Sequence, residues 1–274
     1  MPKIARLTRF VIKSCGGQEL TRAEVTQTGL AEDHRYMLVK PNGVFISQRD
    51  YPKLCRAQSW INGETVMCIA PDLPQLSFPL GYYPGKVIDV EVHQQPFRAV
   101  VMAPEHSHWF SKFLGTECLL VGVPDDMMRI REITVRGEKR QMALLCQDSS
   151  PIHAVTLASI RDLSERIQVK HQDIESPVEI DRFRPNIVIG GTEPYEEEEW
   201  GMVSFSEHVW LEMRKKTGRC PVVNIDQMAA NKSSGVYRTL SGYKRNDEGI
   251  GTFGVHFIPD TLGTIAVGDM VRPD

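Results

Sequence analysis

The stretch DRFRPNIVIGG, residues 181–191, joins a charged approach to a short apolar run that ends in two glycines. The three β-branched residues at 187–189 favour a buried strand. Arg184 and Asn186 flank Pro185 directly before this run, and the proline ring restricts the backbone at that point. The segment therefore predicts a strand whose head presents a guanidinium fork and an amide that both donates and accepts hydrogen bonds.

Strand patterns recur on both sides of this segment. At 86–95, apolar Ile88, Val90 and Val92 alternate with polar residues, as a half-buried strand requires. Further strands are expected at 3–12, 35–40, 44–48 and 220–226. Residues 141–156 are expected to be a buried strand running into a polar turn, and residues 263–273 a last strand, a turn and a short exit. In the first part of the chain, short spacing and glycine and proline punctuation predict a small barrel or strongly curved sheet. We expect a β-rich α+β fold in two intertwined parts, the second beginning near residue 125.

Two helices are predicted between the strands. Residues 105–115 place bulky side chains on one helical face, and Gly115 supplies a C-terminal stop. Residues 156–167 carry an apolar stripe and begin at Thr156, a suitable cap. The two faces are formed by Trp109, Phe110, Phe113 and Leu114, and by Leu157, Ile160, Leu163 and Ile167.

Three polar segments are not assigned catalytic or ligand-binding residues. His106 and His108 are two positions apart, so on a helix they face different ways and are poorly placed to share a metal. The run EEEE at 196–199 is expected to be a solvated loop or helix start. Residues 226–252 are polar and punctuated by glycine, and they predict a mobile loop over a site.

The composition is that of an ordinary globular protein. Of 274 residues, 41% are apolar and 24% charged, and the net charge of −3 gives no general attraction to nucleic acid or to acidic membranes. No apolar run approaches the roughly 18–20 residues that cross a bilayer. The N-terminus resembles neither a signal nor a transit peptide, so a cytosolic location is expected. The six cysteines form no C-x-x-C pair, which argues against zinc-ribbon and thioredoxin-like sites.

Polar groups suited to a site follow strands in three further stretches. Lys13 and Ser14 in IKSCGG suit a phosphate oxygen, with backbone amides exposed by the adjacent glycines. Arg35 in EDHRYMLV stands at the head of an apolar strand, where a surface ion pair is the ordinary alternative. The third stretch, residues 147–153, contributes Asp148, Ser149, Ser150 and His153.

The stretch at 147–153 raises a hydrolase interpretation. No G-x-S-x-G elbow surrounds either serine, and six residues in one turn are poorly suited to the geometry of a catalytic triad. A capped turn that binds a polar ligand through its hydroxyls and carboxylate is the more economical interpretation.

Cys220 in TGRCPVVNID leaves three alternatives open: a buried filler, half of a disulfide, or a ligand. Free cysteine most often behaves as a small buried hydrophobe. Arg219 beside it would favour the thiolate, which is a soft metal ligand. Together with the basic residues, the carboxylate and the amide, such a thiolate suits an anionic heterocyclic cofactor that carries phosphate and a metal.

The chain resembles MOSC-domain proteins that have an N-terminal β-barrel domain. The motifs that carry the resemblance span nearly the whole chain in the family's order, and FRPNIVI followed by RC is the most specific pair. It is most similar to the branch that includes the mitochondrial amidoxime-reducing component and bacterial proteins that detoxify N-hydroxylated bases. The motifs are KSC (13–15), GL and DHRYMLV (29–39), SQRDYPKL (47–54), Asp-Ser-Ser-Pro (148–151), FRPNIVI (183–189), GRC (218–220) and GTIAVGD (263–269).

The resemblance implies an N-terminal β-barrel domain at 1–124 and a MOSC β-barrel domain with peripheral helices at 125–274. It also implies a molybdenum cofactor, Mo-molybdopterin, with Cys220 as the thiolate ligand of the metal. Lys13, Ser14 and Arg35 would close over the phosphate side or the substrate mouth, and Arg219 joins the binding residues beside Cys220. The residues that would hold the pterin and its phosphate are Asp148, Ser149, Ser150, Arg184 and Asn186.

The implied activity is a two-electron reduction of N-oxygenated compounds such as amidoximes, N-hydroxylated bases and hydroxylamines, independent of pyridoxal phosphate. The chain ends at Asp274 without the ferredoxin-like domain of some relatives, so a separate flavin, haem or iron–sulfur protein is expected to supply electrons. His34 stands where the family more often has an acidic residue. His153 replaces an apolar or aromatic residue, and a structural role is favoured over proton donation. The alternative function is a protein that carries or delivers the cofactor, or transfers sulfur to it, without turning over substrate.

Overall fold

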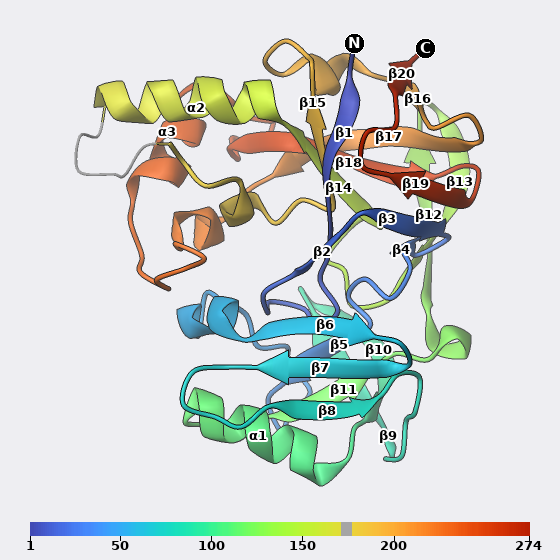
Figure 1. The fold of residues 1–274 in the computed structure, drawn as a ribbon, viewed down its shortest axis with the longest axis vertical. Helices are drawn as coiled ribbons and strands as arrows, with labels where there is room; N and C mark the ends of the chain where they lie inside the picture. Colours follow the sequence, from blue (N-terminus) through green and yellow to red (C-terminus); the bar gives the residue numbers. More distant parts are fainter. Residues whose placement is uncertain (171–176) are drawn as a thin grey trace.

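The computed structural model describes residues 1–170 and 177–274, which form two bodies stacked along the long axis of the molecule (Figure 1). An eight-stranded sheet dominates the upper body. Its strands, in spatial order, are β2 (Gln18–Leu20), β1 (Lys3–Arg9), β15 (Ile187–Gly190), β14 (Ile152–Thr156), β18 (Thr252–Pro259), β17 (Val209–Gly218), β16 (Met202–Phe205) and β20 (Val271–Pro273).

The apolar run predicted as a strand at 187–189 forms β15 in the middle of this sheet. Ile187 pairs with Leu7 of β1 in antiparallel register and with Ala154 of β14 in parallel register. Strand β15 therefore hydrogen bonds the first strand of the chain to the later part of the sequence. Its side chains at 187–189 are almost completely buried, which explains the continuous apolar run.

A second, three-stranded sheet packs against the first. It consists of β19 (Gly263–Ala266), β3 (Arg22–Thr26) and β4 (Gly29–Leu30). Val25 and Ile265 from this sheet share one core with Ile189, Val255 and Phe257 of the larger sheet. The N-terminal strands β1–β4 thus belong spatially to the upper body, which confirms that the two parts of the chain intertwine. The division at residues 124 and 125 stays a prediction about sequence domains.

The lower body contains two small antiparallel sheets and one helix. The first sheet is β5 (Tyr36–Val39), β11 (Leu119–Gly122), β10 (Gln95–Val101) and β9 (Val87–Val92) in that order, and the second is β6 (Gln58–Asn62), β7 (Thr65–Ile69) and β8 (Leu76–Pro79). In β9, Val90 and Val92 are buried while Asp89 is exposed, as the alternation predicted.

Helix α1 (Pro104–Leu114) confirms the predicted helix at 105–115. Gly115 ends it with a φ of 71°, a left-handed conformation that glycine adopts without steric cost. Trp109 and Phe110 are buried in the core of the lower body. His106 is also buried and its ring lies 4.6 Å from that of Phe78, whereas His108 is exposed, so the two histidines face different ways as predicted.

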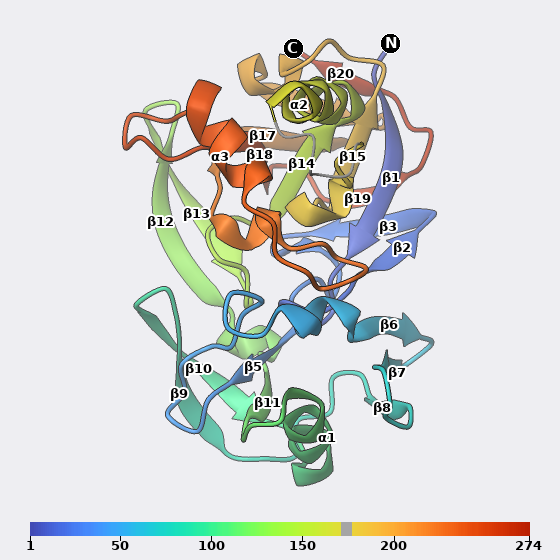
Figure 2. The same ribbon diagram turned by 90° about the vertical axis from the view of Figure 1, so that its left-hand side faces the viewer.

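Helices α2 (Leu157–Lys170) and α3 (Gly235–Tyr243) cover one face of the upper sheet (Figure 2). Leu163 and Ile167 of α2 pack there against Phe253. The hydroxyl of Thr156 accepts a hydrogen bond from the backbone N–H of Ser159 at 3.1 Å, so this residue is the predicted cap. Leu157 is 40% exposed, and its predicted place in the apolar stripe is wrong.

The glutamate run at 196–199 is not solvated throughout, which corrects the prediction for this segment. Glu197 and Glu198 are buried in a short 3-10 turn, η4 (Glu196–Glu199). Burial raises the pKa of Glu197 to about 7, although hydroxyl donors from Ser159 and Thr156 act in the opposite direction. Glu198 pairs with Lys216 at 3.0 Å and with Lys244 at 2.9 Å. The carboxylates are buried because hydroxyls and ammonium groups replace the water they lose.

A long two-stranded ribbon, β12 (Arg129–Val135) and β13 (Glu138–Leu144), runs along one side of the molecule (Figure 2). The remaining short 3-10 segments are η1 (Pro52–Arg56), η2 (Asp125–Met127), η3 (Ile180–Phe183) and η5 (Pro221–Asn224). The strand predicted at 220–226 is therefore wrong, and the one predicted at 44–48 contributes only isolated bridges. Among the described helices, none combines the length and the apolar character that crossing a bilayer requires.

Candidate functional site

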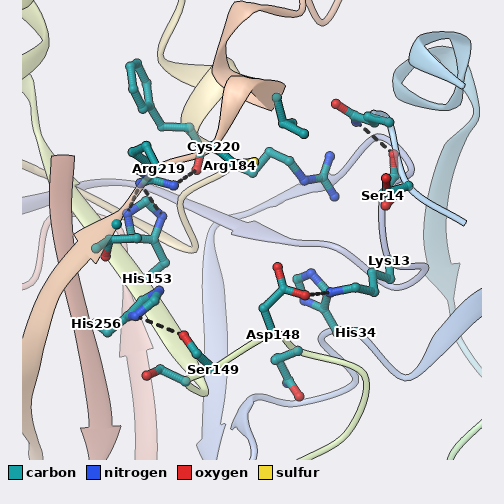
Figure 3. A pocket seen from close by; sticks show the side chains of 18 of the residues that line it. Lys13, Ser14, His34, Asp148, Ser149, His153, Arg184, Arg219, Cys220 and His256 are labelled. Atoms are coloured by element: carbon teal, nitrogen blue, oxygen red, sulfur yellow. Dashed lines mark hydrogen bonds and ion pairs between the residues drawn. The ribbon is translucent and has the colours of Figure 1, made fainter. Parts of the chain in front are cut away.

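A cavity of about 330 Å³ is lined by strand ends, turns and loops from both parts of the chain (Figure 3). Such a volume lies at the lower end of the range typical of small-molecule sites, roughly 300–1,000 Å³. Nine of the ten residues predicted to bind a cofactor or metal line it: Lys13, Ser14, Asp148, Ser149, Ser150, Arg184, Asn186, Arg219 and Cys220.

Arg35 is the predicted residue that the structure does not bring to this cavity. Its guanidinium donates to Glu32 at 2.8 Å, to Asp125 at 2.7 Å and to the carbonyl of Val123 at 2.9 Å. Burial lowers the pKa of Arg35, but Glu32 and Asp125 together raise it by more, so the net shift of the pKa is upward. The side chain is held by protein partners, as the ion-pair alternative anticipated.

Lys13 and Asp148 form an ion pair at one end of the cavity. The ammonium nitrogen lies 2.5 Å from Oδ1 of Asp148, and Nε2 of His93 approaches the same oxygen at 3.3 Å. Desolvation raises the pKa of Asp148, but Lys13 and then His93 lower it to well below its usual range. Asp148 is therefore a carboxylate at neutral pH, and its charge largely offsets that of Lys13.

Arg184 forms no ion pair with any carboxylate in the part of the chain that the structure describes. It follows η3 with a φ of 51°, and its guanidinium lies 4.1 Å above the ring of Phe10. Within residues 1–170 and 177–274 its buried Nη2 also has no hydrogen-bond partner. Desolvation by burial lowers its pKa. An anion bound in the cavity would offset this cost.

Asn186 is engaged in the fold. Its Oδ1 accepts from the backbone N–H of His153 at 3.1 Å, and its Nδ2 donates to the carbonyl of Thr8 at 3.2 Å. The side chain thus links β1, β14 and the head of β15. One N–H and one lone pair of the amide remain for a ligand, so its role toward a cofactor stays a prediction.

Cys220 differs from the other cysteines of the chain. All six are free thiols, and five are buried, whereas Cys220 is partly exposed and lines the cavity. Burial raises the pKa of each of those five thiols, to about 12 for Cys15 and Cys146. The disulfide and buried-filler alternatives therefore do not describe Cys220.

Arg219 is fixed beside this thiol. Its Nε donates to the carbonyl of Phe253 at 3.0 Å and its Nη1 to that of Phe183 at 3.3 Å. Burial lowers the pKa of Arg219 to about 9, even though the neighbouring Cys220 acts in the opposite direction. Its Nη2 also donates to Nε2 of His153, so that ring nitrogen is unprotonated.

His153 and His256 form a second pair at this end of the cavity. They occupy opposite positions on β14 and β18, with ring centroids 5.7 Å apart. Burial first, and the charge of Arg219 second, lower the pKa of both well below the usual value, so both rings are neutral at pH 7. A neutral His153 that accepts from Arg219 supports its structural interpretation.

The arrangement does not favour a serine hydrolase. The hydroxyl of Ser149 lies 3.4 Å from Nδ1 of His256, but Asp148 is directed to Lys13. Arg214 donates to the hydroxyl of Ser150 at 2.8 Å. Among the residues that the structure describes, no carboxylate is hydrogen bonded to His256, so a base oriented by an acid is missing.

Several residues of the cavity were not predicted from the sequence. His93 lies in the turn of a β-hairpin. In the sequence, only the end of the alternating strand pattern marks this position. No local sequence pattern indicates that His256 lies beside His153. The further lining residues not assigned to the site include Asp33, His34, Phe45, Gln48, Arg49, Arg182 and Thr217.

The segment predicted as a mobile loop is partly helical, because α3 occupies 235–243. Its beginning lies against the lower body. The amides of Gln48 and Gln227 exchange hydrogen bonds at 3.1 and 3.0 Å, and Lys232 donates to the carbonyl of Arg49 at 3.2 Å. These contacts place the loop beside the cavity. Its mobility stays a prediction.

The cavity as a whole suits an anion. Five lysine and arginine side chains line it against two aspartates: Lys13, Arg49, Arg182, Arg184 and Arg219 against Asp33 and Asp148. Lys13 is paired with Asp148 and Arg182 with Asp226, so the excess charge comes from Arg49, Arg184 and Arg219. A partly exposed thiol adds one soft ligand for a metal. Excess cations, the unpaired Arg184 and the available Cys220 together fit a phosphate-bearing metal cofactor. Within the described chain no cluster of three or more histidine, cysteine or acidic residues suits a metal ion, so such a metal would need ligands from the cofactor itself.

Two family models match the sequence. The MOSC N-terminal beta barrel domain matches residues 1–117 and the MOSC domain matches residues 89–272. Mitochondrial amidoxime reducing component 2 of Rattus norvegicus is 25% identical over 287 residues, which cover 98% of this chain and 82% of that protein.

A second relative is the molybdenum cofactor sulfurase of Danio rerio. It is 27% identical over 295 residues, which cover 98% of this chain and 34% of that protein, so this chain spans about a third of its length. Among solved structures, the YUAD protein from Bacillus subtilis aligns with 99% of this chain and 94% of its own at a TM-score of 0.44 and 10% identity, too low to bear on function.

Proposed function

This chain belongs to the MOSC family and has the MOSC N-terminal β-barrel, and from that membership we propose that it is a molybdenum-cofactor-dependent reductase of N-hydroxylated and other N-oxygenated compounds. The observation that carries the proposal is Cys220, the one partly exposed thiol, in a cavity with excess positive charge. The amidoxime reducing components, which align over nearly the whole of this chain, support the substrate class.

In this proposal Cys220 is the thiolate ligand of molybdenum. Arg219, anchored on two backbone carbonyls, keeps a positive charge beside that thiolate. Arg184 binds the phosphate, with Lys13 and Ser14 beside it. Arg184 contributes most, because it forms no ion pair with a described carboxylate, whereas Lys13 is already paired with Asp148. Polar groups of Asp148, Ser149, Ser150 and Asn186 contact the pterin.

When bound, the cofactor would supply a two-electron couple at molybdenum for cleavage of an N–O bond. The overall reaction consumes two electrons and two protons, and it releases the reduced nitrogen compound and one water. The protein binds and orients the reactants and keeps His153 and His256 uncharged beside the metal ligand. Electrons come from a separate flavin, haem or iron–sulfur carrier, and we place the protein in the cytosol.

A second candidate is a protein that carries or delivers the cofactor, or transfers sulfur to it, without turning over substrate. The similarity to molybdenum cofactor sulfurases favours it, since the aligned region covers 98% of this chain. Both functions need the same cofactor site. Turnover of an N-hydroxylated base with an artificial electron donor separates them, because a carrier would bind the cofactor and leave the substrate unchanged.

The decisive experiment measures molybdenum and pterin in protein produced by a host that makes the cofactor. We expect about one molybdenum per chain in the native protein, and a loss of at least about 100-fold in reductase activity in Cys220→Ala, since a direct ligand matters at least as much as its outer partners. Cys118→Ala, which removes a buried thiol outside the cavity, is the matched control. A native protein without pterin, or a fully active Cys220→Ala variant, contradicts the proposal.

A further inference from the structure

A second cavity, about 610 Å³ and open to solvent, lies at the foot of the β12–β13 ribbon. Its walls are residues 94–98 of the β9–β10 hairpin and residues 126–131, which lead into β12. Nothing in the proposed reductase chemistry uses it. Its volume is within the range of pockets that bind small molecules, roughly 300–1,000 Å³.

Positive charge dominates this second cavity. Arg98, Arg129 and Arg131 line it against a single carboxylate, Asp126. Within the described chain none of the three arginines forms an ion pair, and Arg131 donates instead to the side-chain carbonyl of Gln95 at 2.8 Å. An anion is therefore the complementary ligand.

Arg129 is the fixed element of the cavity. It is 9% exposed, and its guanidinium lies 4.4 Å from the ring centre of Phe97. Its Nε donates to the carbonyl of Leu145 at 2.8 Å and its Nη2 to that of Gln147. Its buried Nη1 has no partner in the part of the chain that the structure describes. The charge is held in place without a counter-ion, at a desolvation cost that an anion nearby would offset.

The remaining wall is apolar. Met127, Met128 and Phe97 are half-buried, and Ile130 is 54% exposed at the edge. An isolated exposed isoleucine needs no explanation. Here it stands beside two methionines and an aromatic ring in a cavity with three arginines. The combination suits a ligand with an apolar body and one anionic end.

We propose that this cavity binds a small amphipathic anion, such as an arene carboxylate, with its carboxylate at Arg98, Arg129 and Arg131 and its ring against Phe97 and Ile130. The site is independent of the cofactor proposal but adjoins that cavity. In the β9–β10 turn, His93 lines the first cavity and Gln94 the second, and both have a positive φ, of 51° and 61°. Gln147, which lines the first cavity, accepts a hydrogen bond from Arg129.

The test is a calorimetric titration of the purified protein with 2-naphthoate and with its neutral analogue 2-naphthylmethanol. We expect one naphthoate per chain and at least about tenfold weaker binding of the alcohol, because charge-assisted hydrogen bonds are lost. Arg131→Met and Arg98→Met should each weaken naphthoate binding by a similar factor. Ile130→Ser, at an exposed position, should weaken both probes a few-fold through lost apolar contact.

Two controls locate the bound probe. Arg136→Met changes an exposed arginine at the far end of the same ribbon and should leave binding unchanged. Arg184→Met reports on the first cavity and should also leave binding unchanged. The proposal is overturned by an absence of saturable binding up to about 1 mM, by equal affinity for the alcohol, or by loss of binding in Arg184→Met but not in Arg131→Met.

Discussion

The cations at the two ends of the first cavity have different kinds of partner (Figure 3). At one end Lys13 is paired with Asp148, and the carboxylate stays ionised because Lys13, with His93 beside it, lowers its pKa. At the other end Arg219 stands beside Cys220 and two histidines that burial keeps neutral, with carbonyl partners instead of a carboxylate.

The difference indicates where a negative ligand belongs. The Lys13 end is nearly neutral, whereas among the described residues neither Arg219 at the Cys220 end nor Arg184 has a carboxylate partner. A thiolate and an anionic cofactor would supply the missing charge. The following predictions test whether the two ends differ as described, in order of decreasing expected effect.

Arg184→Met should weaken cofactor retention by about 10- to 100-fold, since it removes one or more charge-assisted hydrogen bonds to the anion. The free energy of unfolding of the cofactor-free protein should change by less than about 1 kcal/mol, because an unpaired cation contributes little to stability. Dialysis followed by metal analysis measures the first quantity and urea denaturation the second.

Arg35→Met is the matched control, because Arg35 has two carboxylate partners and lies outside the cavity. It should lower the free energy of unfolding by about 2 kcal/mol and leave cofactor retention unchanged. If instead Arg184→Met destabilises the cofactor-free protein as much as Arg35→Met does, Arg184 has a protein partner and the contrast between the two ends is wrong.

His153→Gln tests the neutral end. The folded-state pKa of His153 is lowered, so the unfolded chain binds a proton first as the pH falls below about 6.5. Native stability should therefore be complete above that pH and fall below it, by up to about 1.4 kcal/mol per pH unit for each buried histidine. The variant should lose about half of this slope, because His256 remains. Urea denaturation at several values between pH 5 and pH 8 measures it.

Glu197 titrates in the opposite sense and must be separated from the histidines. The pKa of Glu197 is raised to about 7. Its contribution to stability therefore falls as the pH rises from 4.5, the ordinary pKa of this group, toward 7. Comparing His153→Gln in a Glu197→Gln background removes this overlap. A pH slope that does not change on His153→Gln in that background means that folding does not lower the pKa of His153.

Asp148→Asn tests the charged end and should have the smallest effect. The folded-state pKa of Asp148 is depressed, so its stabilising effect is present above the unfolded value near 4 and is lost as the pH falls below it. The side chain is 55% exposed, so the effect at pH 7 should stay below about 1 kcal/mol. A difference between variant and native protein that does not shrink as the pH falls below about 4 shows that the ion pair is not its source.

Most elements of the fold were predictable because their causes are local. The β-branched run at 187–189 forms β15, Gly115 ends α1, and Thr156 caps α2. The glutamate run at 196–199 was not predictable, because its burial depends on hydroxyls near residue 156 and on lysines at 216 and 244. Composition alone cannot show that a charged run will meet such partners.

The candidate site divides in the same way. Polar residues at strand ends identified Lys13, Asp148 and Arg184, because strand ends are where side chains can converge on a ligand. Arg35 has the same local pattern, yet its guanidinium is taken by Glu32 and Asp125. A single arginine before a strand does not show which carboxylate will reach it.

The sequence by itself indicated the strands and helices that have strong local patterns, such as β15 and α1, and which residue types could serve a phosphate-bearing metal cofactor. It did not indicate α3 or the 3-10 turn at Pro221–Asn224. The tertiary structure decided which of these charges remain available. Lys13 meets Asp148 across 135 positions of sequence, while Arg184 meets no carboxylate in the described chain. Propensity acts over a few residues, whereas charge compensation depends on which distant side chains the folded backbone brings within a few ångströms.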